Sequence, residues 1–210
     1  MQQKEWGFTS RLLAKYSLPT ASMALCSNEA ELTVSAKRIG YPVAIKAISS
    51  DIVHKSDVGG VALGLKNEEE LISAFKKMKK RVGERPNLKF LVQKMEAGLE
   101  VIAGMKRDAQ FGPVIMVGLG GIFVEIMKDV AFRVAPIKEK EAEAMLRELK
   151  AFKILGGARG KKYDAAALVK ILVKISELSM KEPDVLELDL NPIMLKERGA
   201  AIVDARIMGS

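Results

Sequence analysis

Apolar residues recur at helical spacing in several stretches of the chain, and an Asn or Asp that can cap a helix stands where three of them begin. Asn28 opens a segment that ends at Gly40, and Asn67 opens a second segment of the same kind. Asn side chains cap helix N-termini and Gly commonly ends a helix, so both segments are predicted to be helices. The same periodicity predicts helices near 138–150 and after Asp164.

Short apolar runs lie between these helices and are predicted to be strands. They are Tyr41–Ile48, Val61–Leu65, "KFLVQKM", "GLEVIAGMK", "VLELDL" and "AAIVDA". A turn at Ala97 and Gly98 separates the third run from the fourth, and we expect a hinge between two lobes there. Strands that alternate with helices through short glycine-rich loops indicate an α/β fold.

The strand "VLELDLN" alternates leucine with polar residues, so Asp189 and Asn191 share the face opposite the leucines. If "AAIVDA" returns antiparallel through a turn centred on Glu197 and Arg198, Asn191 lies opposite Asp204. A carboxylate beside an amide oxygen suits Mg²⁺, which takes oxygen ligands and completes its shell with water and phosphate oxygens. From spacing alone, a solvated acidic strand face is the competing explanation.

Lys46 lies in the apolar strand "PVAIKAI", where a lysine that points into a cleft could meet a phosphate as a point charge. The competing explanation is an edge-strand lysine that prevents aggregation. Gly59 and Gly60 could offer backbone N–H groups to phosphate oxygens, although paired glycines also form ordinary turns. The sequence lacks a P-loop motif, and "GLGGIF" lacks the third glycine of a dinucleotide fingerprint, so any nucleotide site is of another type.

His54 is the only histidine of the chain, within "SSDIVHKSDVGGV". One His and one Cys are too few for a zinc site, and no nucleophile-elbow sequence supports a Ser-His-Asp triad. The chemical role left for it is that of a nucleophile that accepts a group on an imidazole nitrogen, with Asp51 or Asp57 as orienting carboxylates. A loop histidine with no chemical role is the alternative.

The chain carries a formal charge of +8 and a pI near 9.5, which favours an anionic ligand or an acidic partner. The basic run "KKMKKR" lies on a predicted helix with an apolar face, and aromatic residues make up only 5% of the chain, so no nucleic-acid binding is expected. The single cysteine, Cys26, excludes an intrachain disulfide. With neither a signal peptide nor a membrane-spanning run in the sequence, we expect a cytoplasmic protein without membrane contact.

Three stretches carry a resemblance to a known family: "GYPVAIKAISSDIVHKSDVGGV", "LVQKMEAGLEVIAGMKRDAQFGPVIMVGLGGIFVEIMKDVAFRVAPI", and "LELDLNPI" with "VDAR". In these stretches the chain resembles the β subunit, the ATP-grasp domain, of NDP-forming acyl-CoA synthetases, most of all the archaeal ADP-forming acetyl-CoA synthetases. The match runs from about residue 10 to residue 207. A more distant likeness is to the β chain of succinyl-CoA synthetase.

The resemblance implies an α/β (α+β) fold, the ATP-grasp fold, whose two lobes hold a nucleotide between them. The implied division is a helical lead-in at 1–20, an N-terminal lobe at 21–92 and a C-terminal lobe with the metal-binding strands at 93–210. The substrate nucleotide would be ATP or ADP, with Mg²⁺ as the cofactor. The implied partner is a CoA-binding α subunit of the same enzyme, in an α2β2 heterotetramer.

The resemblance also implies roles for individual residues. The implied contacts are Lys46, for phosphate; Gln93, Lys94 and Met95, for adenine at the hinge; Glu100, for the ribose or a nearby phosphate; and Asn191 with Asp204, for Mg²⁺. His54 would be phosphorylated and would relay the phosphoryl group from a partner histidine to ADP. Asp189 would either orient the phosphohistidine or bind the metal.

The implied function is that of a ligase subunit that makes ATP from ADP reversibly. An ATP-grasp carboxylate ligase that acts without a histidine relay is the alternative. Loss of His54 would separate the two, because only the relay needs an imidazole.

Overall fold

The computed structural model describes residues 2–49, 59–121, 128–150, 152–156 and 162–210. Backbone contacts divide the chain into two compact units. The larger unit combines Met1–Thr20 with Glu96–Ser210, and the smaller unit is Ala21–Met95. The first twenty residues therefore pack with the second half of the chain, and the smaller unit is an insertion between these two parts.

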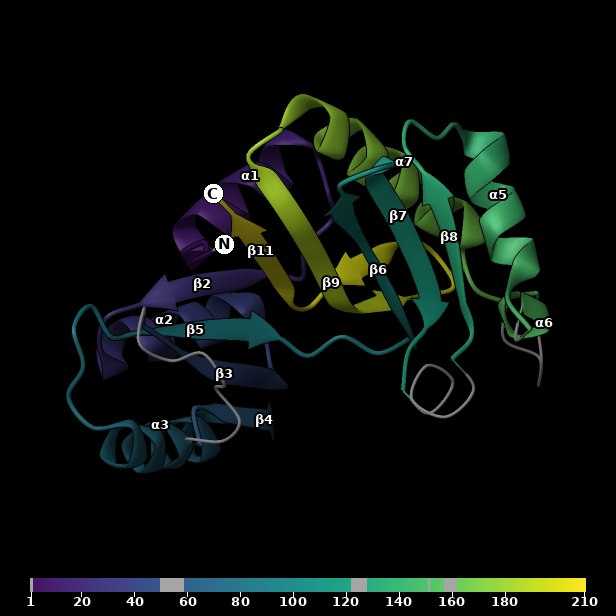
Figure 1. Cartoon of the computed structure of the whole chain (residues 1–210). Helices are drawn as coiled ribbons and strands as arrows, with labels where there is room; N and C mark the ends of the chain where they lie inside the picture. Colours follow the sequence, from purple (N-terminus) through teal and green to yellow (C-terminus); the bar gives the residue numbers. More distant parts are fainter. Residues whose placement is uncertain (1, 50–58, 122–127, 151, 157–161) are drawn as a thin grey trace. The chain divides into compact units, whose positions relative to one another are not determined.

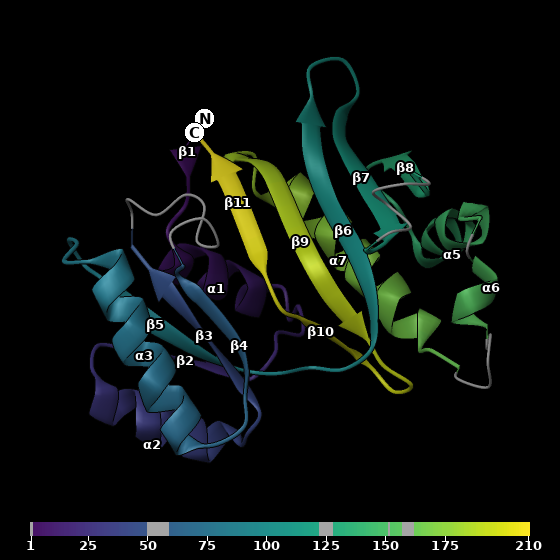
Figure 2. The same cartoon turned by 90° about the horizontal axis from the view of Figure 1, so that it is seen from below.

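The smaller unit contains, in its described residues, a four-stranded antiparallel sheet with the order β2-β5-β3-β4. Its elements are β2 (Met23–Cys26), α2 (Glu29–Ile39), β3 (Val43–Ile48), β4 (Val61–Leu65), α3 (Glu68–Val82) and β5 (Lys89–Lys94). Both helices pack on one face of the sheet (Figure 2), where Leu32 and Phe75 meet Ile45 and Val92. Burial of these apolar side chains is the main stabilising contribution to the unit.

Asn28 and Asn67 cap α2 and α3 as the sequence predicts. Asn28 Oδ1 accepts a hydrogen bond from Glu31 N–H at 2.9 Å, and the Glu31 carboxylate accepts one from Ser27 N–H at 2.8 Å. Asn67 and Glu70 repeat this pattern, with 2.9 Å between Asn67 Oδ1 and Glu70 N. A cap of this kind contributes about 1 kcal/mol. These short-range signals fix where both helices begin.

The larger unit contains, in its described residues, a seven-stranded antiparallel sheet with the order β1-β11-β9-β6-β7-β8, and β10 also pairs with β9. Its strands are β1 (Gln2–Gln3), β6 (Leu99–Asp108), β7 (Gly112–Leu119), β8 (Val130–Val134), β9 (Val185–Leu195), β10 (Ala200–Ile202) and β11 (Ala205–Gly209). Its helices are α1 (Trp6–Lys15), α5 (Glu139–Glu148), α6 (Phe152–Leu155) and α7 (Ala165–Lys181). Figure 1 shows α5 and α7 against one face of this sheet, and we call the opposite face the open face.

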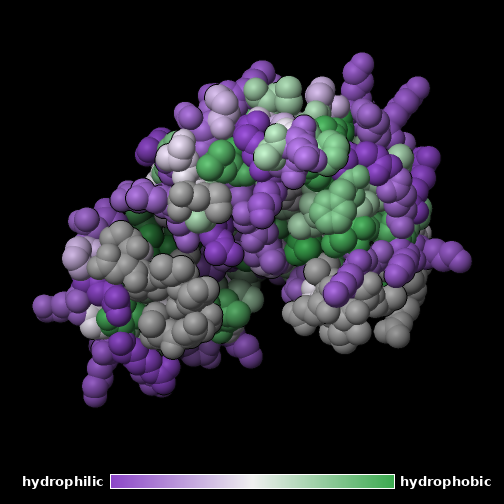
Figure 3. Space-filling view, viewed as in Figure 1, coloured by the Kyte–Doolittle hydropathy of each residue, from purple (hydrophilic) through white to green (hydrophobic). Residues whose placement is uncertain are grey.

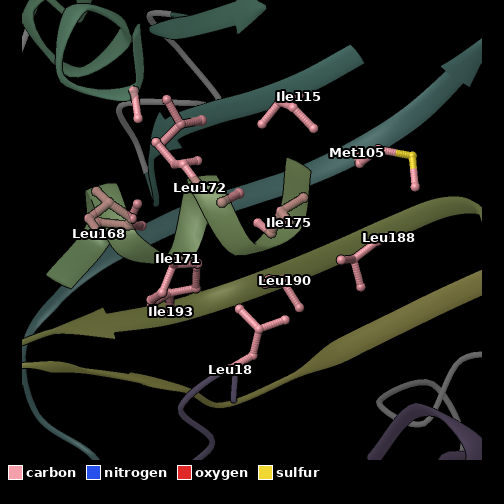
Figure 4. Close-up of a cluster of buried hydrophobic side chains, with 14 of the residues drawn as sticks. Leu18, Met105, Ile115, Leu168, Ile171, Leu172, Ile175, Leu188, Leu190 and Ile193 are labelled. Atoms are coloured by element: carbon pink, nitrogen blue, oxygen red, sulfur yellow. The ribbon is translucent and has the colours of Figure 1, made fainter. Parts of the chain in front are cut away.

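Apolar side chains between α7 and the larger sheet form the main core of this unit (Figure 4). Leu168, Leu172 and Ile175 of α7 are buried there, together with Leu188 and Leu190 of β9. The apolar helix face predicted after the Asp164 cap is therefore confirmed. Because the β9 leucines point into the core, the residues between them point to the open face. Of the described helices, none is both long and apolar enough to cross a membrane.

The predicted strand "AAIVDA" is two strands in the structure. β10 ends at Ile202 and β11 begins at Ala205, although both pair with β9. Pro192 of β9 lies opposite the break, where its carbonyl oxygen accepts from Val203 N–H at 3.0 Å. Pro has no N–H to donate in return, so the ladder of hydrogen bonds is interrupted at this position. The prediction of one continuous strand is wrong for this reason.

Candidate functional site

The predicted hairpin register at the end of β9 is confirmed. A hydrogen bond of 3.0 Å from Lys196 N–H to the Gly199 carbonyl closes the turn, so its two central residues are the predicted ones. Asn191 N–H donates to the carbonyl oxygen of Asp204 at 3.1 Å. The fold therefore brings Asn191 and Asp204 directly opposite each other, one on β9 and one on the link between β10 and β11.

Asp189 is a half-buried carboxylate with several charged neighbours. Burial raises the pKa of Asp189 above its usual value, the Arg206 guanidinium lowers it, and the negative charges of Glu187 and Asp204 raise it. Arg206 Nη2 lies 4.0 Å from an Asp189 carboxylate oxygen, because the two residues pair across β11 and β9. A cation bound nearby would act against the effect of burial and stabilise the ionised form of Asp189.

Asn191 and Asp204 offer the oxygen ligands that Mg²⁺ prefers. One Asp204 carboxylate oxygen accepts from Ala205 N–H at 3.0 Å, which holds this side chain in place. In the described part of the chain, no cluster of three or more His, Cys, Asp or Glu side chains could enclose a metal. Mg²⁺ commonly takes only one or two protein ligands and fills its other positions with water and substrate phosphates. The residues present therefore fit a Mg²⁺ ion that arrives with a nucleotide.

Glu100 lies at the start of β6 beside two glycines that follow β7. Gly120 N–H donates to the Glu100 carbonyl at 2.7 Å, and a Cβ added at Gly120 would come within 2.9 Å of the Glu100 Cβ. A Cβ added at Gly121 would lie 3.7 Å from Glu100 Oε2. Gly120 therefore allows close packing beside Glu100, and the positive φ of Gly121 favours glycine at the next position. The exposed Glu100 carboxylate can accept hydrogen bonds from ribose hydroxyls.

Lys46 lies on β3, an inner strand between β5 and β4. Its chain neighbours Ile45 and Ala47 belong to the core beneath the helices, so Lys46 is on the opposite face of the smaller sheet. Only 6% of Lys46 is exposed. An edge-strand lysine would be solvated, so the explanation of Lys46 as a residue that blocks aggregation is wrong. A largely buried ammonium group is suited to binding an anion.

The segment 93–95, predicted to contact adenine, lies at the end of β5, and its residues form hydrogen bonds within the smaller unit. Lys94 Nζ donates to the carbonyl oxygens of Gly40 at 2.7 Å and Tyr41 at 3.0 Å, where α2 ends. The backbone N–H groups of Lys94 and Met95 donate to carbonyls of the smaller unit at 2.8 and 3.1 Å. Lys94 thus caps a helix C-terminus, and base recognition here would use backbone carbonyls, which can accept from the adenine amino group.

The predicted nucleophile His54 lies outside the described residues, as do the aspartates on either side of it. Gly59 has a φ of +66°, and a Cβ added there would come within 3.0 Å of the Arg81 side chain. The Gly60 carbonyl accepts a backbone hydrogen bond of 2.8 Å from β3. The backbone conformation before β4 therefore requires glycine at position 59, and phosphate binding by the two glycines stays a prediction.

The described site residues form two sets, one in each unit. The set in the larger unit is Glu100, Asp189, Asn191 and Asp204, and the set in the smaller unit is Lys46, Gly59, Gly60 and 93–95. Sequence reasoning missed Arg206 as a neighbour of Asp189. The signal was present, because the register that opposes Asn191 and Asp204 also opposes Asp189 and Arg206.

Known proteins resemble this chain over nearly its whole length. The ATP-grasp domain family matches residues 7–208. The β subunit of acetate–CoA ligase (ADP-forming) I from Pyrococcus furiosus is 45% identical over 203 residues, which cover 94% of this chain and 88% of that protein. Acetate–CoA ligase (ADP-forming) I from Archaeoglobus fulgidus is 47% identical over 203 residues, which are 94% of this chain and only 30% of that protein.

A solved structure with the same fold is the dinucleotide-forming acetyl-coenzyme A synthetase 1 of Candidatus Korarchaeum cryptofilum. It contains coenzyme A and Mg-AMPPCP, with a phosphohistidine segment pointing towards the nucleotide binding site. The match has a TM-score of 0.86 and 37% sequence identity, and it covers 100% of this chain and 93% of that chain. The chain therefore belongs to the ATP-grasp family, among the β subunits of ADP-forming acetyl-CoA synthetases.

Proposed function

We propose that this chain is the nucleotide-binding β subunit of an ADP-forming acyl-CoA synthetase, with acetyl-CoA as the first substrate to test. It relays a phosphoryl group through a phosphohistidine to ADP bound with Mg²⁺, and the reverse reaction consumes ATP. The observation that carries the proposal is the 45% identity with the P. furiosus β subunit across 88% of that protein. The opposed Asn191 and Asp204 and the buried Lys46 support it, because they are the groups a Mg-nucleotide needs.

In this function the two sets of residues have different tasks. Lys46, with the backbone of Gly59 and Gly60, binds phosphate oxygens, and positive charge there lowers the barrier for phosphoryl transfer. The segment 93–95 binds adenine, and Glu100 binds the ribose. Residues 93–95 and Glu100 thus recognise the nucleoside, whereas Lys46 and the two glycines stabilise the phosphoryl group that is transferred.

Asn191 and Asp204 would hold the Mg²⁺ ion. When bound, the ion neutralises phosphate charge and aligns the phosphate oxygens for in-line transfer. Asp189 orients the phosphohistidine by accepting a hydrogen bond from the imidazole nitrogen that does not carry phosphorus. Arg206, 4.0 Å from Asp189, favours the charged form of that carboxylate and so partly offsets the effect of burial on its pKa.

His54 carries the phosphoryl group in two steps. In the first step, the phosphorus–nitrogen bond on a partner histidine breaks while a phosphorus–nitrogen bond to His54 forms. In the second step, the bond to His54 breaks while a terminal phosphate oxygen of ADP bonds to phosphorus, which yields ATP and restores the imidazole. Both steps exchange one bond for another at phosphorus, so no oxidant or reductant takes part.

The partner in this function is the CoA-binding α subunit, which supplies the acyl-CoA site. An α2β2 heterotetramer, a cytoplasmic location and the lobe boundaries 1–20, 21–92 and 93–210 stay predictions. The A. fulgidus relative, of which this chain covers 30%, is consistent with a second part of the enzyme that can also be joined in one polypeptide.

Reconstitution tests the proposed function. The chain mixed with its CoA-binding subunit should make ATP from acetyl-CoA, ADP and phosphate, and the His54→Asn variant should lose this activity. The variant should still bind ADP, and the histidine of the partner should still be phosphorylated, because only the relay is broken. No ATP from the wild-type pair would refute the proposed function, whereas near-normal synthesis by His54→Asn would favour the carboxylate ligase without a relay.

A further inference from the structure

Four apolar side chains gather at one end of the open face of the larger sheet. They are Val114 and Met116 on β7 and Phe132 and Val134 on β8, which we call the β7–β8 patch. Val114 pairs with Val134 and Met116 with Phe132, so the four lie on one face as two adjacent cross-strand pairs. Phe132 is 55% exposed and Val134 is 48% exposed. Figure 3 shows apolar surface over these two strands.

The β7–β8 patch lies in line with the residues proposed to handle the phosphoryl group. One row of cross-strand neighbours runs from Asp189 through Gly104 and Met116 to Phe132. Each step between strands is about 4.8 Å, so Phe132 is roughly 15 Å from Asp189 along this row. Gly104 has no side chain, so in this row no side chain projects from the open face between Asp189 and the patch.

A parallel row, farther from the proposed metal site, supplies polar neighbours on the side of the patch towards β9. It runs from Glu187 through Lys106 to Val114 and Val134. An apolar centre with a polar rim is the usual composition of a protein–protein interface. The composition of the patch and its neighbours is therefore that of the centre of a protein–protein interface.

The other exposed large apolar residues of the described chain lie singly on different elements. They are Phe8 on α1, Leu25 on β2, Val34 on α2, Leu63 on β4, Phe111 in the turn between β6 and β7, and Met180 on α7. Single exposed apolar residues are common on protein surfaces, whereas contiguous ones mark interaction sites. In addition, β8 is the last strand in the order of the described sheet, so its outer edge has backbone groups that another chain could pair with.

We propose that the β7–β8 patch is the docking surface for the CoA-binding subunit, a partner that presents an apolar surface to Phe132. This inference rests on the proposed function, because a phosphoryl donor has to reach Asp189 and His54 from outside this chain. A chain seated on the patch is next to the row that leads to Asp189 and lies on the same face of the sheet. The P. furiosus relative is a β subunit by name, so that protein works with another subunit, whereas the A. fulgidus relative is a single longer chain.

Phe132 is the residue on which the test should concentrate. Aromatic side chains at the centre of an interface contribute a large share of its affinity. The Phe132→Ala variant should therefore raise the Kd for the purified CoA-binding subunit roughly tenfold or more, measured by isothermal titration. Val134→Thr keeps the volume and β-branching and should raise the Kd by a smaller factor. Val34→Thr, at a residue of the smaller unit that is 68% exposed, is the matched control and should leave the Kd unchanged.

Three further measurements keep the proposal open to refutation. The thermal unfolding midpoint checks that each variant is folded, and Val134→Thr replaces Phe132→Ala if the latter is not. The affinity of each variant for Mg-ADP, without the partner, should equal the wild-type value, and a lower affinity would assign the patch to the nucleotide site and overturn the proposal. Sedimentation of the chain alone should be unchanged by Phe132→Ala, and loss of a dimer would assign the patch to a contact between two copies.

The reconstituted activity separates failure of this inference from failure of the proposed function. If the wild-type pair makes ATP and Phe132→Ala binds the partner as tightly as the wild type does, only the docking surface is refuted. If the wild-type pair makes no ATP, the proposed function fails first. If Phe132→Ala weakens ATP synthesis at low partner concentration and saturating partner restores it, the patch is a docking surface.

Discussion

Gly104 pairs with Asp189 where the backbone of β9 passes close to β6, and its replacement by Ala should destabilise the larger unit. A Cβ at position 104 would come within 2.4 Å of the Leu188 carbonyl oxygen and 3.5 Å of the Asp189 Cα. Ordinary contacts of a Cβ begin near 3.4 Å, so β9 would have to shift by about 1 Å. Overpacking of this kind costs about 1–3 kcal/mol.

A smaller effect acts in the opposite direction. Gly104 is not among the glycines with positive φ, so Ala can adopt its backbone conformation and would restrict the unfolded chain. That restriction stabilises a protein by about 0.4–1 kcal/mol. The net expectation is a loss of about 1–2 kcal/mol in the free energy of unfolding.

Urea unfolding of the larger unit measures this change. Trp6 is the only tryptophan of the chain and packs against the core of the larger unit, so its fluorescence reports on that unit. Gly7→Ala is the matched control, because a Cβ there would lie 3.6 Å from the Arg11 guanidinium, an ordinary contact. This control should be as stable as the wild type or more so, by up to about 1 kcal/mol. A Gly104→Ala variant no less stable than the wild type would refute the close approach of the two strands.

Three other variants test the site and its surroundings. Lys46→Met should lower the affinity for ADP roughly tenfold without changing the unfolding midpoint, because it removes a charged contact to phosphate. An unchanged affinity in calorimetric titration would contradict this role of Lys46. Asp204→Ala should raise the Mg²⁺ concentration needed for ADP binding roughly tenfold or more, and identical Mg²⁺ titrations would exclude Asp204 as a ligand. The pKa of Asp164 is lowered by hydrogen bonds from the N–H groups of Gly199 and Ala167, so its carboxylate stabilises the fold above the unfolded pKa of about 4. In urea unfolding, Asp164→Ala should therefore lower the free energy of unfolding by its full amount near pH 7 and by less as the pH falls below about 4. A decrease that does not depend on pH would show that the charge of Asp164 is not what stabilises the fold.

Features that depend on neighbouring residues could be read from the sequence. The caps at Asn28 and Asn67 need only a residue three positions away, and the turn at Lys196–Gly199 fixes the pairing of Asn191 with Asp204. Local chemistry determines each of these features.

Features set by distant parts of the chain could not be read in this way. β7 and β8 were not predicted as strands, because Val114 and Phe132 are apolar on the open face and hide the alternation that marks a half-buried strand. The assignment of 1–20 to the larger unit depends on the pairing of β1 with β11, which no local pattern shows. The burial of Lys46 likewise follows from the position of β3 between two other strands, whereas the sequence left an edge strand equally open.

The insertion of the smaller unit between two parts of the larger one has a consequence for biosynthesis. The smaller unit is a continuous segment, so it can fold while the ribosome is still making the rest of the chain. The larger unit has to wait, because β11, the last strand, lies between β1 and β9 in the sheet. Until Ala205–Gly209 leaves the ribosome, the edge of β9 has no partner there and α1 lacks part of its packing surface. A nascent chain stalled before β11 should therefore protect the smaller unit from protease and leave the larger unit sensitive.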